Sequence, residues 1–209
     1  MIATGMAAND QTIVEEVLHG DRHAFRTLVE RHQDRLYDLA FRLTGHRQEA
    51  EDIVQTAFVR MYSRLSGCDP RLGFSNWAYT ITLNAARDLL RRRAILRVFS
   101  LDRRAAPDEE EDPPPEPEDA GPTPEDRLLN EEMLAQLHRC VRELPLGLSA
   151  VFILRYFHHD DVEDIARKLG VSKNVVHVRL CRARERLQRE LAERFPAAKS
   201  AVGDGGGPS

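Results

Sequence analysis

The sequence predicts an all-α protein in which two small helical domains are joined by an acidic, proline-rich linker. Apolar residues recur at three- and four-residue spacing over most of the chain, and no segment alternates with a period of two for long enough to form a strand. A length of 209 residues is enough for one ordinary domain or two small ones. We expect domains at residues 10–98 and 127–195, a linker at residues 99–126 and a disordered tail at residues 196–209.

The net charge of −4 is the average of segments with opposite charge. Residues 105–126 contain ten acidic residues, no basic residue and seven of the eleven prolines. Without these ten charges the rest of the chain carries +6, so two moderately basic domains flank an acidic strip. Arginine accounts for 27 of the 30 basic residues, and its guanidinium group is well suited to bind phosphates and bases. The overall acidity therefore does not exclude a nucleic-acid-binding protein.

The composition argues against several other classes of protein. Mean hydropathy is −0.47 and no apolar run approaches the ~20 residues of a membrane span, so we expect no membrane insertion. The N-terminus lacks a basic stretch followed by a long apolar one, as a secretory signal would have. Cys68, Cys140 and Cys181 are too few and too scattered for a disulfide framework or a paired-cysteine metal site. We expect a cytoplasmic protein without metal or cofactor, and no nucleophile–base pair or phosphate-binding glycine loop suggests an enzyme.

Three amphipathic helices are expected in the N-terminal domain, at about residues 21–43, 48–65 and 74–93. Tyr79 lies off the apolar stripe of the third helix and is a candidate for stacking on an unpaired base. Basic side chains beside such a ring suit single-stranded nucleic acid, although a solvated basic face has the same composition. The basic residues on or just after this helix are Arg87, Arg91, Arg92, Arg93 and Arg97.

The C-terminal domain contains the most specific pattern, that of a helix-turn-helix. After helices at about residues 128–144 and 147–157, Asp161 is expected to cap a short helix. Gly170 then permits a tight turn, and Ser172 caps a second, long helix. The second helix of such a motif enters the major groove of DNA, whereas the alternative is a helical pair with a solvated basic face. The residues available for bases and phosphates are Lys173, Asn174, His177, Arg179 and Arg182.

Three parts of the chain resemble conserved regions of the sigma-70 family of transcription initiation factors. Residues 49–58 (EAEDIVQTAF) resemble its region 2 helix, and residues 74–79 (FSNWAY) with the basic run that follows resemble its promoter-melting helix. Segments between residues 143 and 187, including LGVS and RLCRARERL, resemble its region 4. The length and the two-domain layout are similar to those of the extracytoplasmic-function (ECF) subgroup, and the resemblance covers about residues 17–97 and 128–191.

The resemblance implies a factor that binds core RNA polymerase and promoter DNA, helps to initiate transcription and is bound by an anti-sigma factor. The polymerase would contact the polar face of the second helix, formed by Asp52, Gln55 and Thr56. The minus-10 element would be bound by Cys68, Asp69, Arg71, Tyr79, Asn84, Arg87, Arg91 and Arg92. The minus-35 element would be bound by Ser172, Lys173, Asn174, His177, Arg179 and Arg182.

Two segments depart from the family pattern. The recognition helix has Asn-Val-Val-His-Val at residues 174–178, where Gly-Thr-Val-Lys-Ser is usual, and this leaves the minus-35 sequence open. The loop at residues 158–161 has His-His-Asp-Asp where Gly and Leu are frequent. These four side chains raise the alternative of a metal site, but neighbouring residues on a short loop rarely converge on one ion without further ligands.

The acidic strip and the overall function each allow more than one interpretation. The strip is a solvated spacer, a mimic of RNA that threads through the polymerase channels as the resemblance implies, or an internal mask for the basic domains. The alternatives to a sigma factor are a sigma-like decoy that binds an anti-sigma factor and an ordinary helix-turn-helix transcriptional regulator. Binding to core polymerase distinguishes the sigma factor from both.

Overall fold

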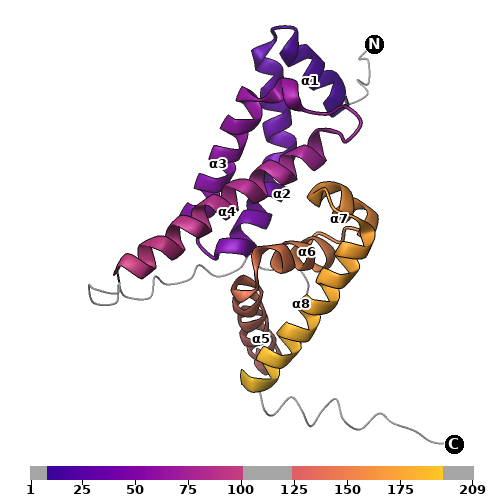
Figure 1. Ribbon diagram of the computed structural model, residues 1–209. Helices are drawn as coiled ribbons and strands as arrows, with labels where there is room; N and C mark the ends of the chain where they lie inside the picture. The colour runs from indigo at the N-terminus through magenta and orange to yellow at the C-terminus, as the bar shows by residue number, and fades with distance from the viewer. Residues whose placement is uncertain (1–8, 101–123, 195–209) are drawn as a thin grey trace, which may run out of the picture.

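The structure, a computed structural model, describes residues 9–100 and 124–194 (Figure 1). Within these ranges it contains helices and no strand, so the predicted all-α fold is confirmed. The expectations for the acidic strip and for the tail concern residues that lie almost entirely outside the described ranges. The N-terminal unit consists of α1 (Asp10–Leu18), the 3₁₀ helix η1 (Arg22–Ala24), α2 (Phe25–Thr44), α3 (Arg47–Ser63), the 3₁₀ helix η2 (Leu65–Gly67) and α4 (Phe74–Ser100). The C-terminal unit consists of α5 (Pro124–Glu143), α6 (Leu146–Tyr156), α7 (Val162–Leu169) and α8 (Lys173–Arg194).

The core of the N-terminal unit lies where α2, α3 and α4 pack against one another. The apolar stripes that the sequence predicts are the buried faces of these helices, because residues three and four apart share one side of a helix. Helix α1 was not expected, and its Ile13 and Val14 add a further buried turn to this core. The fully buried residues include Leu28, Leu36, Leu39, Ala50, Ile53, Ala57, Met61, Phe74 and Ala78.

The C-terminal unit is a helix-turn-helix packed on two further helices. Asp161 caps α7, where its Oδ1 accepts a hydrogen bond from the Asp164 amide at 2.7 Å. Gly170 ends α7 in the left-handed region with φ of 63°, and the Ser172 hydroxyl accepts a hydrogen bond from the Val175 amide at 3.4 Å. All three capping expectations are thereby confirmed. Apolar residues at three- and four-residue spacing predict the inward face of the last helix, and all four are buried: Val176, Leu180, Ala183 and Leu187.

Helix α5 differs from its expected packing. Met133 and Leu134 belong to the apolar stripe that the residue spacing predicts for this helix, but they are 57% and 36% exposed. His138 and Cys140 on the same helix are buried instead. The buried face of this helix is therefore partly polar. Hydrophobic periodicity does not detect such a face, because it considers only apolar residues.

The two units pack against each other (Figure 1). Helix α2 contacts α5 and α6, and α4 contacts α7. Gly45, which ends α2 with φ of 79°, lies at this interface, because a Cβ at this position would be 2.8 Å from Nε of Arg142 on α5. The interface decides which of the predicted DNA-binding residues are accessible.

Candidate nucleic-acid interface

The polar face of α3 is exposed, as expected. Asp52, Gln55 and Thr56 lie opposite the buried Ile53 and Ala57. Val59 continues the same face one turn later and is 64% exposed. This apolar residue was missed in the sequence, although its spacing from Asp52 places it on the same side of the helix. The face therefore combines polar groups with an uncovered apolar side chain, which suits contact with another protein.

The loop between α3 and α4 is held in a compact turn. Oδ1 of Asp69 accepts a hydrogen bond from the Arg71 amide at 2.9 Å, and Gly73 has φ of 76°. Asp69 and Arg71 are exposed, whereas Cys68 is only 8% exposed. Burial, assisted by the carboxylate of Asp69, raises the pKa of the Cys68 thiol. Cys68 thus packs inside the unit, and its burial does not support the expected contact with DNA.

The exposed side of α4 carries a basic stripe. Asn84, Arg87, Arg91 and Arg92 are all exposed, and Nη1 of Arg87 donates a hydrogen bond to Oδ1 of Asn84 at 2.5 Å. Arg93 differs, because it is half-buried and its Nη1 lies 3.3 Å from a carboxylate oxygen of Glu49 on α3. The basic run therefore divides into side chains that face solvent and one that joins two helices.

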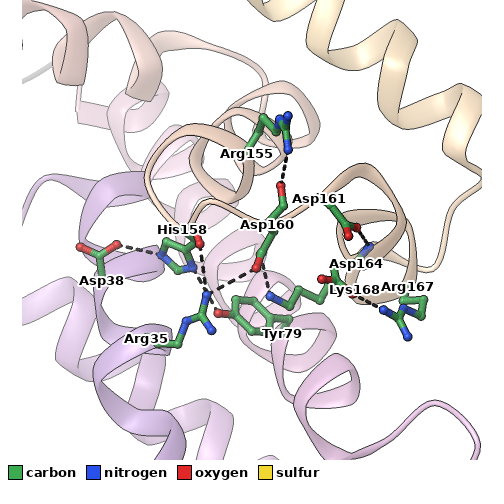
Figure 2. A network of polar contacts seen from close by, with 10 residues as sticks. All are labelled: Arg35, Asp38, Tyr79, Arg155, His158, Asp160, Asp161, Asp164, Arg167 and Lys168. Carbon is green, nitrogen blue, oxygen red and sulfur yellow. Dashed lines mark hydrogen bonds and ion pairs between the residues drawn. The ribbon is translucent and has the colours of Figure 1, made fainter.

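Tyr79 has a different environment from the one expected for a stacking residue. It is 2% exposed, its hydroxyl lies 3.2 Å from Nδ1 of His158, and the ammonium of Lys168 lies 4.4 Å from its ring centroid (Figure 2). Burial is the main cause that raises the pKa of Tyr79 to about 12. Both contacting residues belong to the C-terminal unit, so this unit covers Tyr79 in the structure.

The first turns of α8 present most of the expected minus-35 residues to solvent. Ser172, Lys173, Asn174, His177 and Arg182 are exposed, and Arg179 is half-buried. Val175 and Val178 on the same face are 37% and 49% exposed, so the altered recognition helix offers apolar as well as polar groups. Apolar side chains in a major groove contact the methyl group of thymine, which supplies one route to sequence preference.

A groove of about 150 Å³ lies between α4 and the C-terminal unit, beside the contact of α4 with α7. Its walls include Asn84 and Arg87 from the expected minus-10 surface and Arg179 from the expected minus-35 surface. Arg179 lies 95 positions after Asn84 and 92 after Arg87 in the chain, and only the packing of the two units brings them together.

The loop at residues 158–161 does not form the metal site considered as an alternative. Nε2 and Nδ1 of His158 lie within hydrogen-bond distance of Asp38 and Tyr79, and the carboxylate of Asp160 lies 2.6 Å from Nζ of Lys168 (Figure 2). Asp161 caps α7. Across the described residues, no group of three or more histidine, cysteine or acidic side chains could hold a metal ion. Among the helices of residues 9–100 and 124–194, none has the length and apolar character of a membrane span.

Comparisons with known proteins agree with this arrangement. The family model for sigma-70 region 2 matches residues 28–95, and the model for sigma-70 region 4 matches residues 134–187. The RNA polymerase sigma-H factor of Pseudomonas aeruginosa is 32% identical over 87% of this chain and 93% of its own length. The ECF RNA polymerase sigma factor SigW of Bacillus subtilis is 29% identical over 86% of this chain and 95% of its own length.

Solved structures of similar fold include two complexes. CnrH in complex with the cytosolic domain of CnrY aligns with a TM-score of 0.60 and 24% identity, over 88% of this chain and 97% of that chain. The sigma factor RpoE in complex with the anti-sigma factor NepR from Bartonella quintana aligns with a TM-score of 0.58 and 22% identity, over 80% and 96%. The fold and the two matched regions define a sigma-70-type protein. The chain belongs to the sigma-70 family, and within it to the ECF sigma factors.

Proposed function

We propose that this sigma factor binds core RNA polymerase and directs it to promoters with separate minus-10 and minus-35 elements. The observation that carries the proposal is the presence of two exposed basic faces on two different helical units, one on α4 and one on α8. Phosphates attract both faces, and because the faces belong to different units they can bind two elements of one DNA molecule. RNA polymerase works on the chromosome, so the proposal places the protein in the cytoplasm.

The α3 face is assigned to the polymerase. Asp52, Gln55 and Thr56 form a polar patch beside the exposed Val59, and an interface core that mixes apolar and hydrogen-bonding groups is typical of protein–protein contacts. Both this face and the basic stripe of α4 are exposed, so each surface is available to a partner.

The loop after η2 and the exposed side of α4 are assigned to the minus-10 strand. Asp69, Arg71 and Asn84 offer hydrogen bonds to bases, while Arg87, Arg91 and Arg92 supply cations for phosphates. Extruding a base costs a few kcal/mol, and contacts to the DNA backbone offset that cost. Tyr79 joins this surface only when the C-terminal unit moves away from it.

The start of α8 is assigned to duplex DNA at the minus-35 element. Ser172, Lys173 and Arg182 suit phosphates, Asn174 and His177 suit base edges, and Arg179 lies at the edge of the groove between the units. Because phosphate contacts release counterions, binding of this unit to duplex DNA should weaken steeply as salt is raised.

A further protein is expected to control this factor. The two solved neighbours are bound to the cytosolic domain of CnrY and to the anti-sigma factor NepR. We propose an anti-sigma partner of this kind. A decoy that binds only such a partner is the competing function, which the altered recognition helix favours, and it would not bind core polymerase.

The test is transcription from genomic promoter fragments with core polymerase and the purified protein. We expect discrete transcript starts that disappear when Arg91→Ala is combined with Arg92→Ala. The control combines Arg22→Ala with Arg26→Ala, which removes the same charge from exposed positions near the start of α2. Loss of starts with the control as well would show that net charge alone is responsible. A protein that does not bind core polymerase would refute the proposal.

A further inference from the structure

The loop between α6 and α7 binds the N-terminal unit through His158. The side chain is 4% exposed, and its Nε2 lies 2.8 Å from Oδ2 of Asp38 on α2. Its Nδ1 lies 3.2 Å from the hydroxyl of Tyr79 on α4. Both ring nitrogens therefore lie within hydrogen-bond distance of side chains of the N-terminal unit, one on α2 and one on α4 (Figure 2).

A second set of contacts surrounds Asp160. One carboxylate oxygen lies 2.6 Å from Nζ of Lys168 within the C-terminal unit, and the other lies 3.4 Å from Nη2 of Arg35 on α2. The Thr80 hydroxyl on α4 donates a hydrogen bond to the Lys168 carbonyl at 3.0 Å. Asp160 and Lys168 are buried together, so the pair is shielded from water and from salt.

The polar contacts continue into an aromatic one. The guanidinium of Arg42 on α2 lies 4.0 Å from the ring centroid of Phe157. His138 stacks on the same ring, with the two centroids 5.0 Å apart. Arg42 also binds Asp38 at 2.7 Å. Burial opposes ionisation of Asp38, but hydrogen bonds from His158 and Arg42 outweigh it and lower the pKa of this carboxyl. The anion that His158 contacts is therefore stabilised from two sides.

These contacts have a consequence for DNA binding. They hold α7 against α4, where Tyr79 is covered and where Asn84 and Arg87 line the groove shared with Arg179. A DNA strand that stacks on Tyr79 needs the space that His158 and Lys168 occupy. The closed packing and the promoter-bound state therefore exclude each other at this point.

We propose that His158, Asp160 and Lys168 form a latch with Arg35, Asp38 and Tyr79, which keeps the free protein closed and hides part of the minus-10 surface. The assignment of that surface rests on the proposed function, whereas the closure itself does not. If only the open form binds the strand, the apparent affinity of the protein is the affinity of the open form multiplied by the fraction of molecules that are open. Weakening the latch should therefore tighten binding without adding any contact to DNA.

The latch is tested with His158→Ala, and with Arg35→Ala as a second variant because Arg35 is on the other unit and is 55% exposed. The matched control is His159→Asn, since His159 is the exposed neighbour with φ of 58°, a conformation that asparagine tolerates. Small-angle scattering measures the size of the full chain. Fluorescence anisotropy measures binding of a labelled single strand of mixed sequence, about 12 nucleotides long.

We expect His158→Ala to enlarge the radius of gyration and to tighten strand binding about tenfold, as the loss of one buried charge-assisted hydrogen bond would do. Arg35→Ala should act in the same direction with a smaller effect, and His159→Asn should change neither quantity. An unchanged size and affinity in both latch variants would overturn the proposal. Expansion without tighter binding would also overturn it, because the closed packing would then hide nothing.

Circular dichroism separates opening from unfolding, since opened variants retain their helical signal and a thermal transition. Promoter-directed transcription is measured in parallel with core polymerase. If the latch variants open and bind the strand more tightly but neither they nor the native chain initiates transcription, the latch stands and the proposed function fails.

Discussion

His138 makes the stability of this protein depend on pH in a range where most carboxylates do not titrate. Its side chain is buried on α5, and burial, assisted by the charges of Arg42 and Arg142, lowers its pKa to about 4. In the unfolded chain a histidine has a pKa of about 6.5. Between these two values the unfolded chain binds a proton that the folded protein does not bind. Stability is therefore unaffected by His138 above pH 6.5 and falls as the pH drops toward 4.

The size of this effect follows from the two pKa values. At pH 5 nearly all unfolded chains carry the proton on this residue, against about a tenth of the folded molecules. The free energy of unfolding should accordingly fall by about 2 kcal/mol between pH 7 and pH 5. Replacing the side chain with a ring that cannot be protonated, in His138→Phe, should remove this part of the pH dependence and keep the stacking on Phe157.

Urea denaturation followed by circular dichroism at pH 7 and pH 5 measures the effect. The native chain should lose about 2 kcal/mol more than His138→Phe over this interval, and the control His159→Asn should behave like the native chain. If the free energy of unfolding falls equally in the native chain and in His138→Phe, the pH dependence does not come from His138 and some other group is responsible.

Three further predictions concern single residues. Asp161→Ala removes the cap of α7 and should lower the free energy of unfolding by about 1 kcal/mol in urea denaturation, whereas Asp161→Asn should retain most of it. Gly45→Ala should destabilise the protein by about 1 kcal/mol or more, because φ is 79° and the new Cβ would lie 2.8 Å from Nε of Arg142; a neutral result would show that Arg142 moves without cost. Val178→Ala should weaken binding to a minus-35 duplex. Replacing thymine with uracil, which lacks the methyl group, should weaken binding of the native chain to the same extent. If the variant weakens binding and uracil does not, Val178 does not contact thymine methyl groups.

The elements that could be predicted from the sequence are those whose causes are local. Asp161, Gly170 and Ser172 act within a few residues of their own positions, so the helix-turn-helix and its caps were predicted correctly. The apolar stripe of α8 was predicted for the same reason, since its period follows from helix geometry. The sequence also predicts the basic stripe of α4, in which Arg87, Arg91 and Arg92 are exposed and Arg93 is half-buried. The side chain of Arg97 lies outside the described part of the chain.

The interface between the units could not be predicted in this way. The contact between Asp38 and His158 joins residues 120 positions apart, and no periodicity reports such a pairing. The burial of Tyr79 follows from that interface, so a residue that leaves the apolar stripe of its own helix is nevertheless covered. The unusual composition of the loop at residues 158–161 was the available signal, but it suggested only a metal site, which the short loop disfavours, and not a contact with the other unit.

Permanganate reactivity of unpaired thymines measures whether this protein opens promoter DNA together with core RNA polymerase. A promoter fragment is incubated with core polymerase, with and without the protein. We expect reactive thymines at the minus-10 element only when both proteins are present, and their loss when Arg91→Ala is combined with Arg92→Ala. Protection of the fragment without any reactive thymine, or equal reactivity in the double variant, would contradict this expectation.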